Sequence, residues 1–236
     1  VAPKFPNQKF LVIDTVVDQP NVKSVLFAEH EGAYLVGVAA AHKAKADGKN
    51  TVGFIGGMES EVIHRFEAGF VAGVKSVDPN LTILIDYANS FDDDAKGQTL
   101  AAKQFDEGAY IIMHAAGQTG NGVIKEARDR RNYNDVRWVI GVDRDQYEDG
   151  IYDEANNRSV ILTSMVKRVD IATETIARQT LEGFFTPGVS IFDLSNDGVG
   201  IPARNPNLSD EVIERVLEAR LKIINGEIEV PSTVER

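Results

Sequence analysis

The chain has 236 residues, of which 43% are hydrophobic and 26% are charged, an ordinary composition for one large globular domain or two small lobes. Its formal net charge of -11 argues against a nucleic-acid-binding surface, because such a surface would be basic. The sequence contains no cysteine, which excludes disulfides, thiolate metal sites and a cysteine nucleophile. No apolar run approaches the ~20 residues that a membrane span needs.

Taken in order, the sequence alternates predicted strands and predicted helices. The second helix carries hydrophobic residues every three or four positions from Val62 to Val74, and Gly48 and Pro79 mark where the first two helices end. The expected strands lie at residues 10–15, 22–27, 51–55, 81–86, 110–115, 137–142, 160–165 and 190–194. The expected helices lie at residues 29–45, 59–77, 94–107, 120–130, 169–181 and 210–224. This order predicts an α/β fold with mostly parallel sheets and helices on both faces.

Several predicted strands end in a polar residue, namely Asp14, Asp86, His114 and Asp143. Ligands of open α/β sheets bind in the crevice past the carboxyl ends of the strands, so these residues indicate a cleft for a small polar molecule. Asp143 could accept two hydrogen bonds from a vicinal diol such as a ribose edge, or it could cap the loop that follows it. Asp14 has the same placement and leaves the same two alternatives.

Three further residues near strand ends also leave alternatives open. Lys167 could pair with a carboxylate and donate to the ligand, or it could be a solvated lysine at a helix start. His114 is interpreted as a structural or ligand-facing hydrogen bonder rather than a metal ligand, because no second metal-binding side chain lies at a suitable spacing. Phe91 could stack on a base or anchor its loop.

Two other segments contain residues that could take part in binding or chemistry. The glycine-rich residues 117–122 follow a strand and open a helix, so their backbone could approach a ligand, or the glycines could simply serve the turn. Asp92, Asp93 and Asp94 could bind a metal, but they are more simply explained as favourable charges at a helix N-terminus. The sequence has neither a Gly-x-Ser-x-Gly motif nor paired histidines, so catalysis finds little support.

Five motifs together resemble the basic membrane protein (BMP) or PnrA-like family, the purine-nucleoside-binding lipoproteins of ABC transporters. They lie at residues 52–59, 65–70, 87–92, 114–123 and 138–146, so the resemblance covers nearly the whole chain. It implies an α/β type I periplasmic-binding-protein fold, in which two doubly wound parallel-sheet lobes are joined by a hinge. The N-terminal part of the first lobe, about three strand–helix units in the family, is expected to be absent from this chain.

The resemblance also implies a domain division. Residues 1–79 would form the remaining part of the first lobe, and residues 80–167 would form the second lobe. Residues 168–236 would supply the hinge crossovers and the closing elements that the lobes share. The strands at 10–14 and 51–55 would both belong to the first lobe and would pair with its absent strands.

The implied site lies between the lobes. Asp143 and Lys167 would hold the ribose hydroxyls, and Asp14 would contact the ligand from the first lobe. The other ligand-binding residues would be Met58, Phe91, Met113, His114, Ala116 and Gly117. Met113 stands where the family usually has an aromatic residue, although a methionine can still pack on a base through its polarisable sulfur. Gln118 stands where glycine is usual.

The expected function is therefore an extracytoplasmic solute-binding protein of an ABC importer. It would bind purine nucleosides by hinge closure, without catalysis, a cofactor or a metal. Its partners would be the permease and ATPase subunits rather than nucleic acid, and an N-terminal lipid anchor that is not present in this chain would hold it at the membrane. Two alternatives remain: the effector-binding domain of a transcription regulator with the same architecture, and an enzyme acting on nucleosides.

Overall fold

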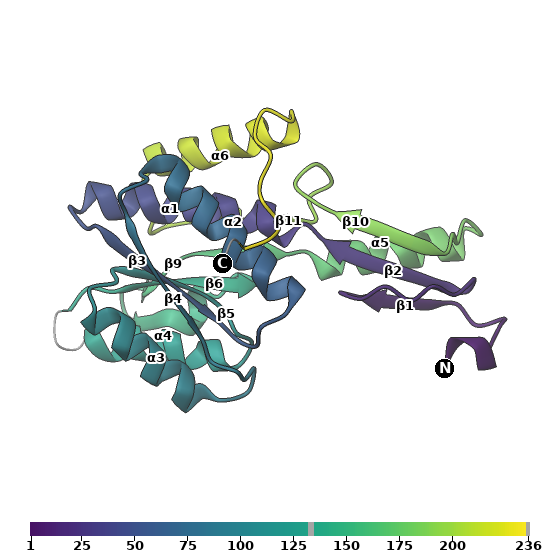
Figure 1. Cartoon of the computed structure of the whole chain (residues 1–236), viewed down its shortest axis with the longest axis horizontal. Helices are drawn as coiled ribbons and strands as arrows, with labels where there is room; N and C mark the ends of the chain where they lie inside the picture. Colours follow the sequence, from purple (N-terminus) through teal and green to yellow (C-terminus); the bar gives the residue numbers. More distant parts are fainter. Residues whose placement is uncertain (132–134, 235–236) are drawn as a thin grey trace.

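Two separate sheets organise the molecule, and a computed structural model places them at opposite ends of its long axis (Figure 1). The structure describes residues 1–131 and 135–234. Within those residues, the strands of both main sheets pair in parallel, apart from the short strand β11 (Val199–Gly200). The α/β class and the mostly parallel pairing that the sequence predicts are therefore confirmed.

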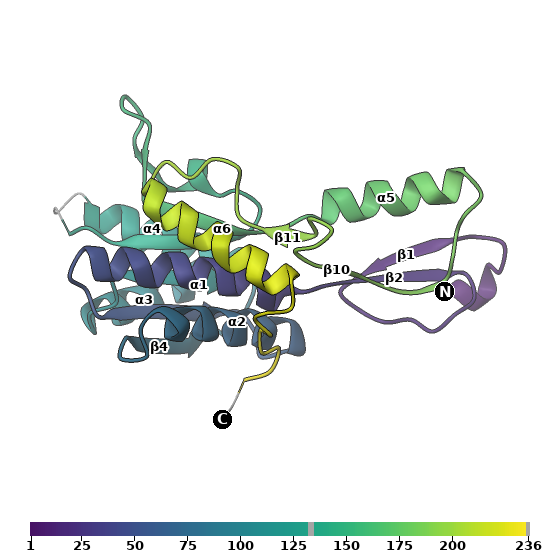
Figure 2. The same ribbon diagram turned by 90° about the horizontal axis from the view of Figure 1, so that it is seen from above.

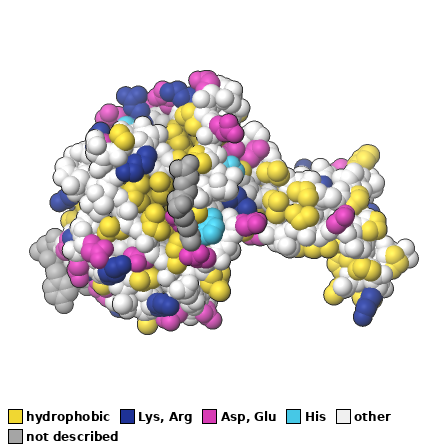
Figure 3. Space-filling view, in the orientation of Figure 1, with side chains coloured by type: hydrophobic (Ala, Val, Ile, Leu, Met, Phe, Trp, Pro, Cys, Tyr) yellow, Lys and Arg dark blue, Asp and Glu magenta, His cyan; other side chains and the backbone are white. Residues whose placement is uncertain are grey.

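The small sheet contains, in the described part of the chain, three strands in the order β1-β2-β10. They are β1 (Phe10–Ile13), β2 (Val22–Phe27) and β10 (Gly188–Phe192). A short 3-10 helix, η1 (Ala2–Lys4), precedes them, and helix α5 (Val169–Leu181) runs along one side of the sheet (Figure 2). Strand β10 leaves Val189 and Ile191 exposed, and Figure 3 shows hydrophobic side chains on the visible face of this end of the molecule.

The large sheet has the order β11-β9-β6-β5-β3-β4 among the described residues. Besides β11, its strands are β3 (Thr51–Gly56), β4 (Thr82–Tyr87), β5 (Ile111–Ala115), β6 (Trp138–Asp143) and β9 (Ile161–Lys167). Strands β3 and β5 are buried along their whole length, as expected of apolar runs that are covered on both faces.

Helices cover both faces of the large sheet (Figure 1). Helices α1 (Glu29–Ala46) and α2 (Glu61–Val77) share a hydrophobic core with one face, and α6 (Asp210–Ile224) packs against α1. Helices α3 (Asp94–Asp106) and α4 (Thr119–Arg131) share a second core with the other face. The short helix η2 (Tyr147–Gly150) leads into a hairpin of β7 (Ile151–Asp153) and β8 (Arg158–Ser159), which the sequence analysis does not predict.

Strand β3 lies inside the large sheet, where Thr51 is opposite Thr82 of β4 and Val52 is opposite Ile111 of β5. This differs from the expected grouping of residues 51–55 with residues 10–14 in a first lobe that ends at residue 79. The physical reason is that β3 presents apolar side chains to both faces, so it needs a neighbouring strand on each side and a helix layer on each face. The chain leaves the small sheet after β2, and β3 is the first strand of the large sheet along the sequence.

The described chain passes between the two sheets three times: from β2 to α1, from β9 to α5, and from β10 to β11. Figure 2 shows these connections as narrow segments between the two ends of the molecule. Consequently, the last residues of β2 and β9 lie at the junction of the two sheets.

Helices α1 and α2 approach each other closely because glycines line their interface. A Cβ added to Gly69 would lie 2.0 Å from the carbonyl oxygen of His30, and one added to Gly73 would lie 2.2 Å from the carbonyl oxygen of Tyr34. Since no side chain fits at either place, the absence of a Cβ sets the distance between these two helices.

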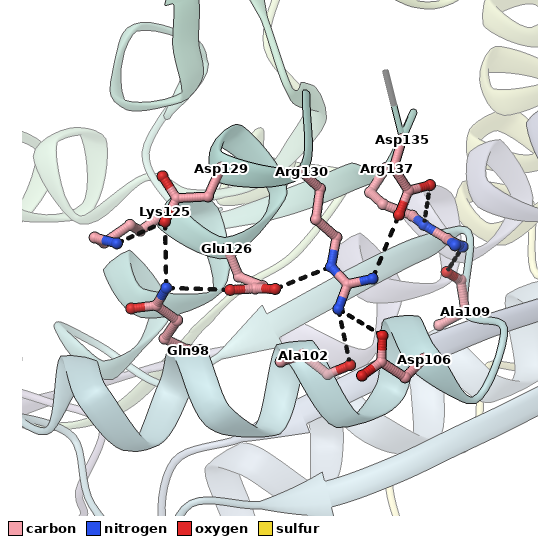
Figure 4. Close-up of polar contacts among 10 residues, drawn as sticks. All are labelled: Gln98, Ala102, Asp106, Ala109, Lys125, Glu126, Asp129, Arg130, Asp135 and Arg137. Carbon is pink, nitrogen blue, oxygen red and sulfur yellow. Dashed lines mark hydrogen bonds and ion pairs between the residues drawn. The ribbon is translucent and has the colours of Figure 1, made fainter. Parts of the chain in front are cut away.

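Arg130 joins α3, α4 and the segment that precedes β6 (Figure 4). Its guanidinium pairs with Glu126 at 2.9 Å, with Asp106 at 2.8 Å and with Asp135 at 3.3 Å. It also donates a hydrogen bond of 3.2 Å to the carbonyl oxygen of Ala102. Because α3 and α4 end at the edge where the parallel strands begin, this network lies away from the carboxyl ends of the strands.

Candidate functional site

A cavity of about 310 Å³ lies at the carboxyl ends of strands from both sheets. Asp14 reaches it from the end of β1 in the small sheet, whereas Asp143 and Lys167 reach it from β6 and β9 in the large sheet. The remaining lining residues are Ser60, Val62, Ile63, Phe66, Phe91, Ala115, Gly117 and Val142. The volume is at the lower end of the range for small-molecule sites.

Lys167 and Asp14 form a close ion pair across the junction of the two sheets. The Lys167 ammonium donates to both carboxylate oxygens of Asp14, each at 2.6 Å. The Lys167 side chain is only 6% exposed, and its Nζ lies 4.9 Å from the centre of the Phe27 ring. Of the two alternatives for Lys167, the structure therefore supports pairing with a carboxylate rather than full solvation.

Glu29 and Arg65 form a second ion pair, which lies deeper in the protein and contacts the first one through Lys167. Glu29, the first residue of α1, is fully buried, and its Oε1 lies 3.1 Å from Lys167 Nζ. Its Oε2 accepts a hydrogen bond of 2.7 Å from Arg65 Nε on α2. We call Asp14, Glu29, Arg65, Asp143 and Lys167 the strand-end charge cluster.

Asp143 ends β6 with a left-handed backbone, at a φ of 67°. Its side chain keeps contact with solvent, yet the surrounding protein removes enough hydration to raise the pKa of its carboxyl above the usual value. The nearby Lys167 opposes that rise, whereas the negative charges of Asp14 and Glu29 add to it. Asp143 is thus a carboxylate with incompletely satisfied charge at the wall of a cavity, as expected of a group that accepts hydrogen bonds from a ligand.

Two other predicted site residues, Phe91 and Gly117, also line the cavity. The Phe91 ring lies over Gly57, where an added Cβ would be 2.2 Å from a ring carbon. The ring is 40% exposed, so part of its surface remains available to another apolar group. Both interpretations of Phe91 are compatible with this position, because it packs on its own loop and still faces the cavity.

The remaining predicted site residues do not line this cavity. Met113 and His114 are both fully buried on β5, because alternation along the strand directs Met113 into the core beneath α1 and α2 and His114 toward Gly120 of α4. Ala116 is fully buried as well. Met58 is 49% exposed and lies outside the residues that line the cavity.

The acidic run before α3 has a local structural role. Asp93 caps the helix by accepting a hydrogen bond of 2.9 Å from the Lys96 backbone N–H, and Asp94 lies in its first turn. No cluster of three or more metal-binding side chains occurs among the residues that the structure describes. The simpler of the two interpretations, favourable charge at a helix N-terminus, accounts for these residues.

The sequence analysis missed the first turns of α2 as part of the site. Ser60 caps this helix through the Ile63 backbone N–H, and the cap turns Val62, Ile63 and Phe66 toward the cavity. The available signal was the Gly56-Gly57 pair between β3 and α2, which has the same placement as the glycine-rich segment before α4. Glu29 gave no such signal, because an acidic residue at a helix start is normally exposed.

A larger hollow of about 690 Å³ lies between β11, α6 and residues 200–205. Two arginines on its wall already pair with acidic residues, Arg168 with Asp170 and Arg220 with Asp197. None of the strand-end charge cluster lines this hollow, so we place the candidate site in the smaller cavity.

Replacement of His114 with glutamine is expected to make the free energy of unfolding less dependent on pH between pH 7 and pH 4. Burial lowers the pKa of His114 from 6.5 to about 4, only partly offset by Gln146 and Asp149. Between these values the unfolded chain takes up a proton that the folded chain excludes, so the free energy of unfolding falls as the pH drops. The contribution is about 3 kcal/mol over that interval. Denaturant unfolding of both proteins from pH 7 to pH 4 measures it, and parallel curves would contradict the assignment.

The fold and the site define a class of protein: an α/β chain with two sheets and a ligand-sized cavity at strand ends where the sheets meet, which is the architecture of type I periplasmic solute-binding proteins. The chain belongs to the Bmp family, described as ABC transporter substrate-binding protein PnrA-like, whose family model matches residues 1–234. The resemblance inferred from the sequence motifs is thereby confirmed.

Two curated relatives illustrate this membership. The chain is 45% identical over 230 residues to the CD4+ T-cell-stimulating antigen of Listeria innocua, covering 95% of this chain and 64% of the relative. It is 42% identical over 234 residues to the ABC transporter nucleoside-binding protein BmpA of Lactococcus lactis, covering 96% of this chain and 65% of the relative. The chain thus spans less than two thirds of the length of these relatives.

Solved structures agree on the fold. A solute-binding protein of an ABC transporter system from Aeropyrum pernix superposes with a TM-score of 0.84 at 26% identity, covering all of this chain and 74% of that one. A protein from Bacillus halodurans described as a transcriptional activator of the comK gene superposes with a TM-score of 0.82 at 22% identity, covering 98% of this chain and 75% of that one. The latter likeness shows the fold alone. In the described part of this chain, every helix is too short or too polar to cross a bilayer.

Proposed function

We propose that the protein binds a purine nucleoside between its two sheets and delivers it, chemically unchanged, to the permease and ATPase subunits of an ABC importer. The single observation that carries this proposal is the cavity in which strand-end charges from both sheets converge. Family membership and the name of the Lactococcus lactis relative support the same role. The protein would act outside the cytoplasm, held at the membrane through an N-terminal lipid anchor.

The cavity offers complementary surfaces for the two halves of a nucleoside. Asp143 can accept hydrogen bonds from two neighbouring hydroxyls, and the Lys167 ammonium can donate to a ribose oxygen. In the same cavity, Phe91 is 40% exposed and offers aromatic surface to a base, whereas Phe66 lines the cavity but is almost wholly buried. A ligand with only one of these halves leaves the other part of the cavity without a partner, which is how buried polar groups create specificity.

The charge balance of the site favours a nucleoside over a nucleotide. With all five groups ionised, the three carboxylates and two cations of the strand-end charge cluster carry a net charge of -1. A phosphate group would add negative charge to a site in which the Lys167 ammonium is already paired with Asp14 and Glu29. Like charges in a desolvated site repel strongly, so a phosphorylated ligand is disfavoured.

The proposal is tested by calorimetric titration of the protein with guanosine, inosine, cytidine, ribose and guanosine monophosphate, with the Lactococcus lactis relative as the positive control. We expect guanosine or inosine to bind at least about 10-fold more tightly than ribose or the monophosphate. Equal affinity for ribose and guanosine would contradict a nucleoside site. Release of free base from inosine on incubation would contradict the non-catalytic part of the proposal.

A further inference from the structure

Glu29 does not line the cavity of the candidate site. It contacts Lys167, which does line the cavity, from the side that faces the protein interior. Its side chain is 0% exposed, and each of its oxygens faces a different cation. A buried carboxylate that loses its charged partner is strongly destabilised, so this arrangement ties the positions of Arg65 and Lys167 to that of Glu29. Glu29 enters the nucleoside-binding proposal only through the net charge of the site, and no contact with the ligand is assigned to it.

The Lys167 ammonium is shared unequally between two carboxylates. It lies 2.6 Å from both oxygens of Asp14 and 3.1 Å from Glu29 Oε1. Asp14 belongs to the small sheet, whereas Glu29 begins α1 and Arg65 lies on α2, both of which pack on the large sheet. Any movement of one sheet relative to the other therefore changes the distance from Asp14 to Lys167, while Glu29 and Lys167 stay in the same body.

We propose that Glu29 is a positioning residue, which holds the Lys167 ammonium at the cavity wall when Asp14 moves away or turns to a ligand, and that Arg65 limits how strongly Glu29 attracts it. Without the charge of Glu29, the ammonium follows Asp14 and the large sheet loses its donor to the ligand. Without Arg65, Glu29 has Lys167 as its remaining cationic partner and holds it more tightly. This inference depends on the proposed function only for the identity of the ligand.

The first test uses the ligand-free protein and does not require nucleoside binding. The rate at which acetic anhydride modifies Lys167 is measured by mass spectrometry in the parent protein and in the variants Glu29→Gln and Arg65→Met. We expect faster modification of Lys167 in Glu29→Gln and slower modification in Arg65→Met. A general loosening of the structure would raise the rate in both variants. A rise in both variants, or an unchanged rate in Glu29→Gln, would therefore overturn the proposal.

The second test is a double-mutant cycle on guanosine affinity. We expect Glu29→Gln to weaken binding about 10-fold in the parent protein but to have almost no effect in the Lys167→Met background, because Glu29 acts through Lys167. Additive losses would contradict that route. Glu126→Gln is the matched control: it also removes a carboxylate from a network of ion pairs, but away from the strand ends, and affinity should not change.

The two tests separate the two proposals. If no protein binds a nucleoside but Lys167 modification responds in the expected opposite directions, then the ligand is wrong and the role of Glu29 stands. If guanosine binds and the cycle is additive, then the function stands and the role of Glu29 fails. Should Glu29→Gln not fold, the Arg65→Met rate decides alone, since an increase there overturns the proposal and a decrease supports it.

Discussion

Replacement of Asp143 with alanine is expected to weaken nucleoside binding by about 2–4 kcal/mol, because a diol loses hydrogen bonds to a charged acceptor in a partly desolvated site. The ligand-free Asp143→Asn variant, whose side chain tolerates the positive φ at this position, should be no less stable than the parent at neutral pH. Burial and two neighbouring carboxylates raise the pKa of Asp143, which means that its ionised form is disfavoured in the folded protein. A loss of affinity without a loss of stability identifies a residue that serves binding.

The measurement is guanosine calorimetry together with denaturant unfolding. Because Asp143 has a positive φ, Asp143→Asn is the companion variant: asparagine tolerates this backbone, removes the charge and replaces one acceptor oxygen with an NH2 donor. Affinity of the parent should also fall as the pH drops through the raised pKa of Asp143, and that dependence should disappear in Asp143→Asn. Glu148→Ala, an exposed carboxylate on η2, is the control for loss of negative charge. An Asp143→Ala protein that binds guanosine as tightly as the parent would remove Asp143 from the site.

Replacement of Gly69 with alanine is expected to destabilise the protein by about 3 kcal/mol, although the same change in an exposed helix stabilises it. The added Cβ would lie 2.0 Å from the carbonyl oxygen of His30, so one of the two packed helices must move. Displacement of α1 would also shift Glu29 at its start, so weaker ligand binding should accompany the loss of stability.

Gly32 of α1 is a matched glycine, and its replacement tests whether contact with backbone atoms causes the destabilisation expected of Gly69→Ala. In Gly32→Ala the nearest atom is the terminal methyl carbon of Met165, at 2.7 Å, and a flexible side chain can move aside. Urea unfolding should therefore show a clearly smaller loss for Gly32→Ala than for Gly69→Ala. Equal losses would mean that contact with backbone atoms does not set the distance between α1 and α2.

Local patterns were enough to predict the elements but not how they are grouped. The spacing of Val62, Phe66, Phe70 and Val74 predicts α2, and the apolar run before Asp143 predicts β6; both are confirmed. The position of β3 could not be derived in this way, because its two apolar faces show only that both must be covered, and local patterns do not show which sheet has helices on both faces. Short elements such as β7, β8 and β11 carry too few residues to show a period.

The candidate site was predicted only in part for a related reason. Asp14, Asp143 and Lys167 could be selected because each ends an apolar strand, and the structure brings them to one cavity. The pairing of Asp14 with Lys167 spans 153 positions, so only the order of strands in space can reveal it. Glu29 is an ordinary acidic residue in the sequence, and its importance follows from burial, which depends on the whole fold.

The three chain passages between the sheets have a mechanical consequence. Segments that link two rigid bodies at one junction allow rotation about that junction and resist sliding, so points beside the axis hardly travel while distant points sweep an arc. Glu29 and Lys167 each stand within two residues of such a link, whereas Asp14 ends a strand that has none. We therefore expect a rotation of the small sheet to change the distance from Asp14 to Lys167 more than the distance from Glu29 to Lys167, although all three residues lie close to the junction.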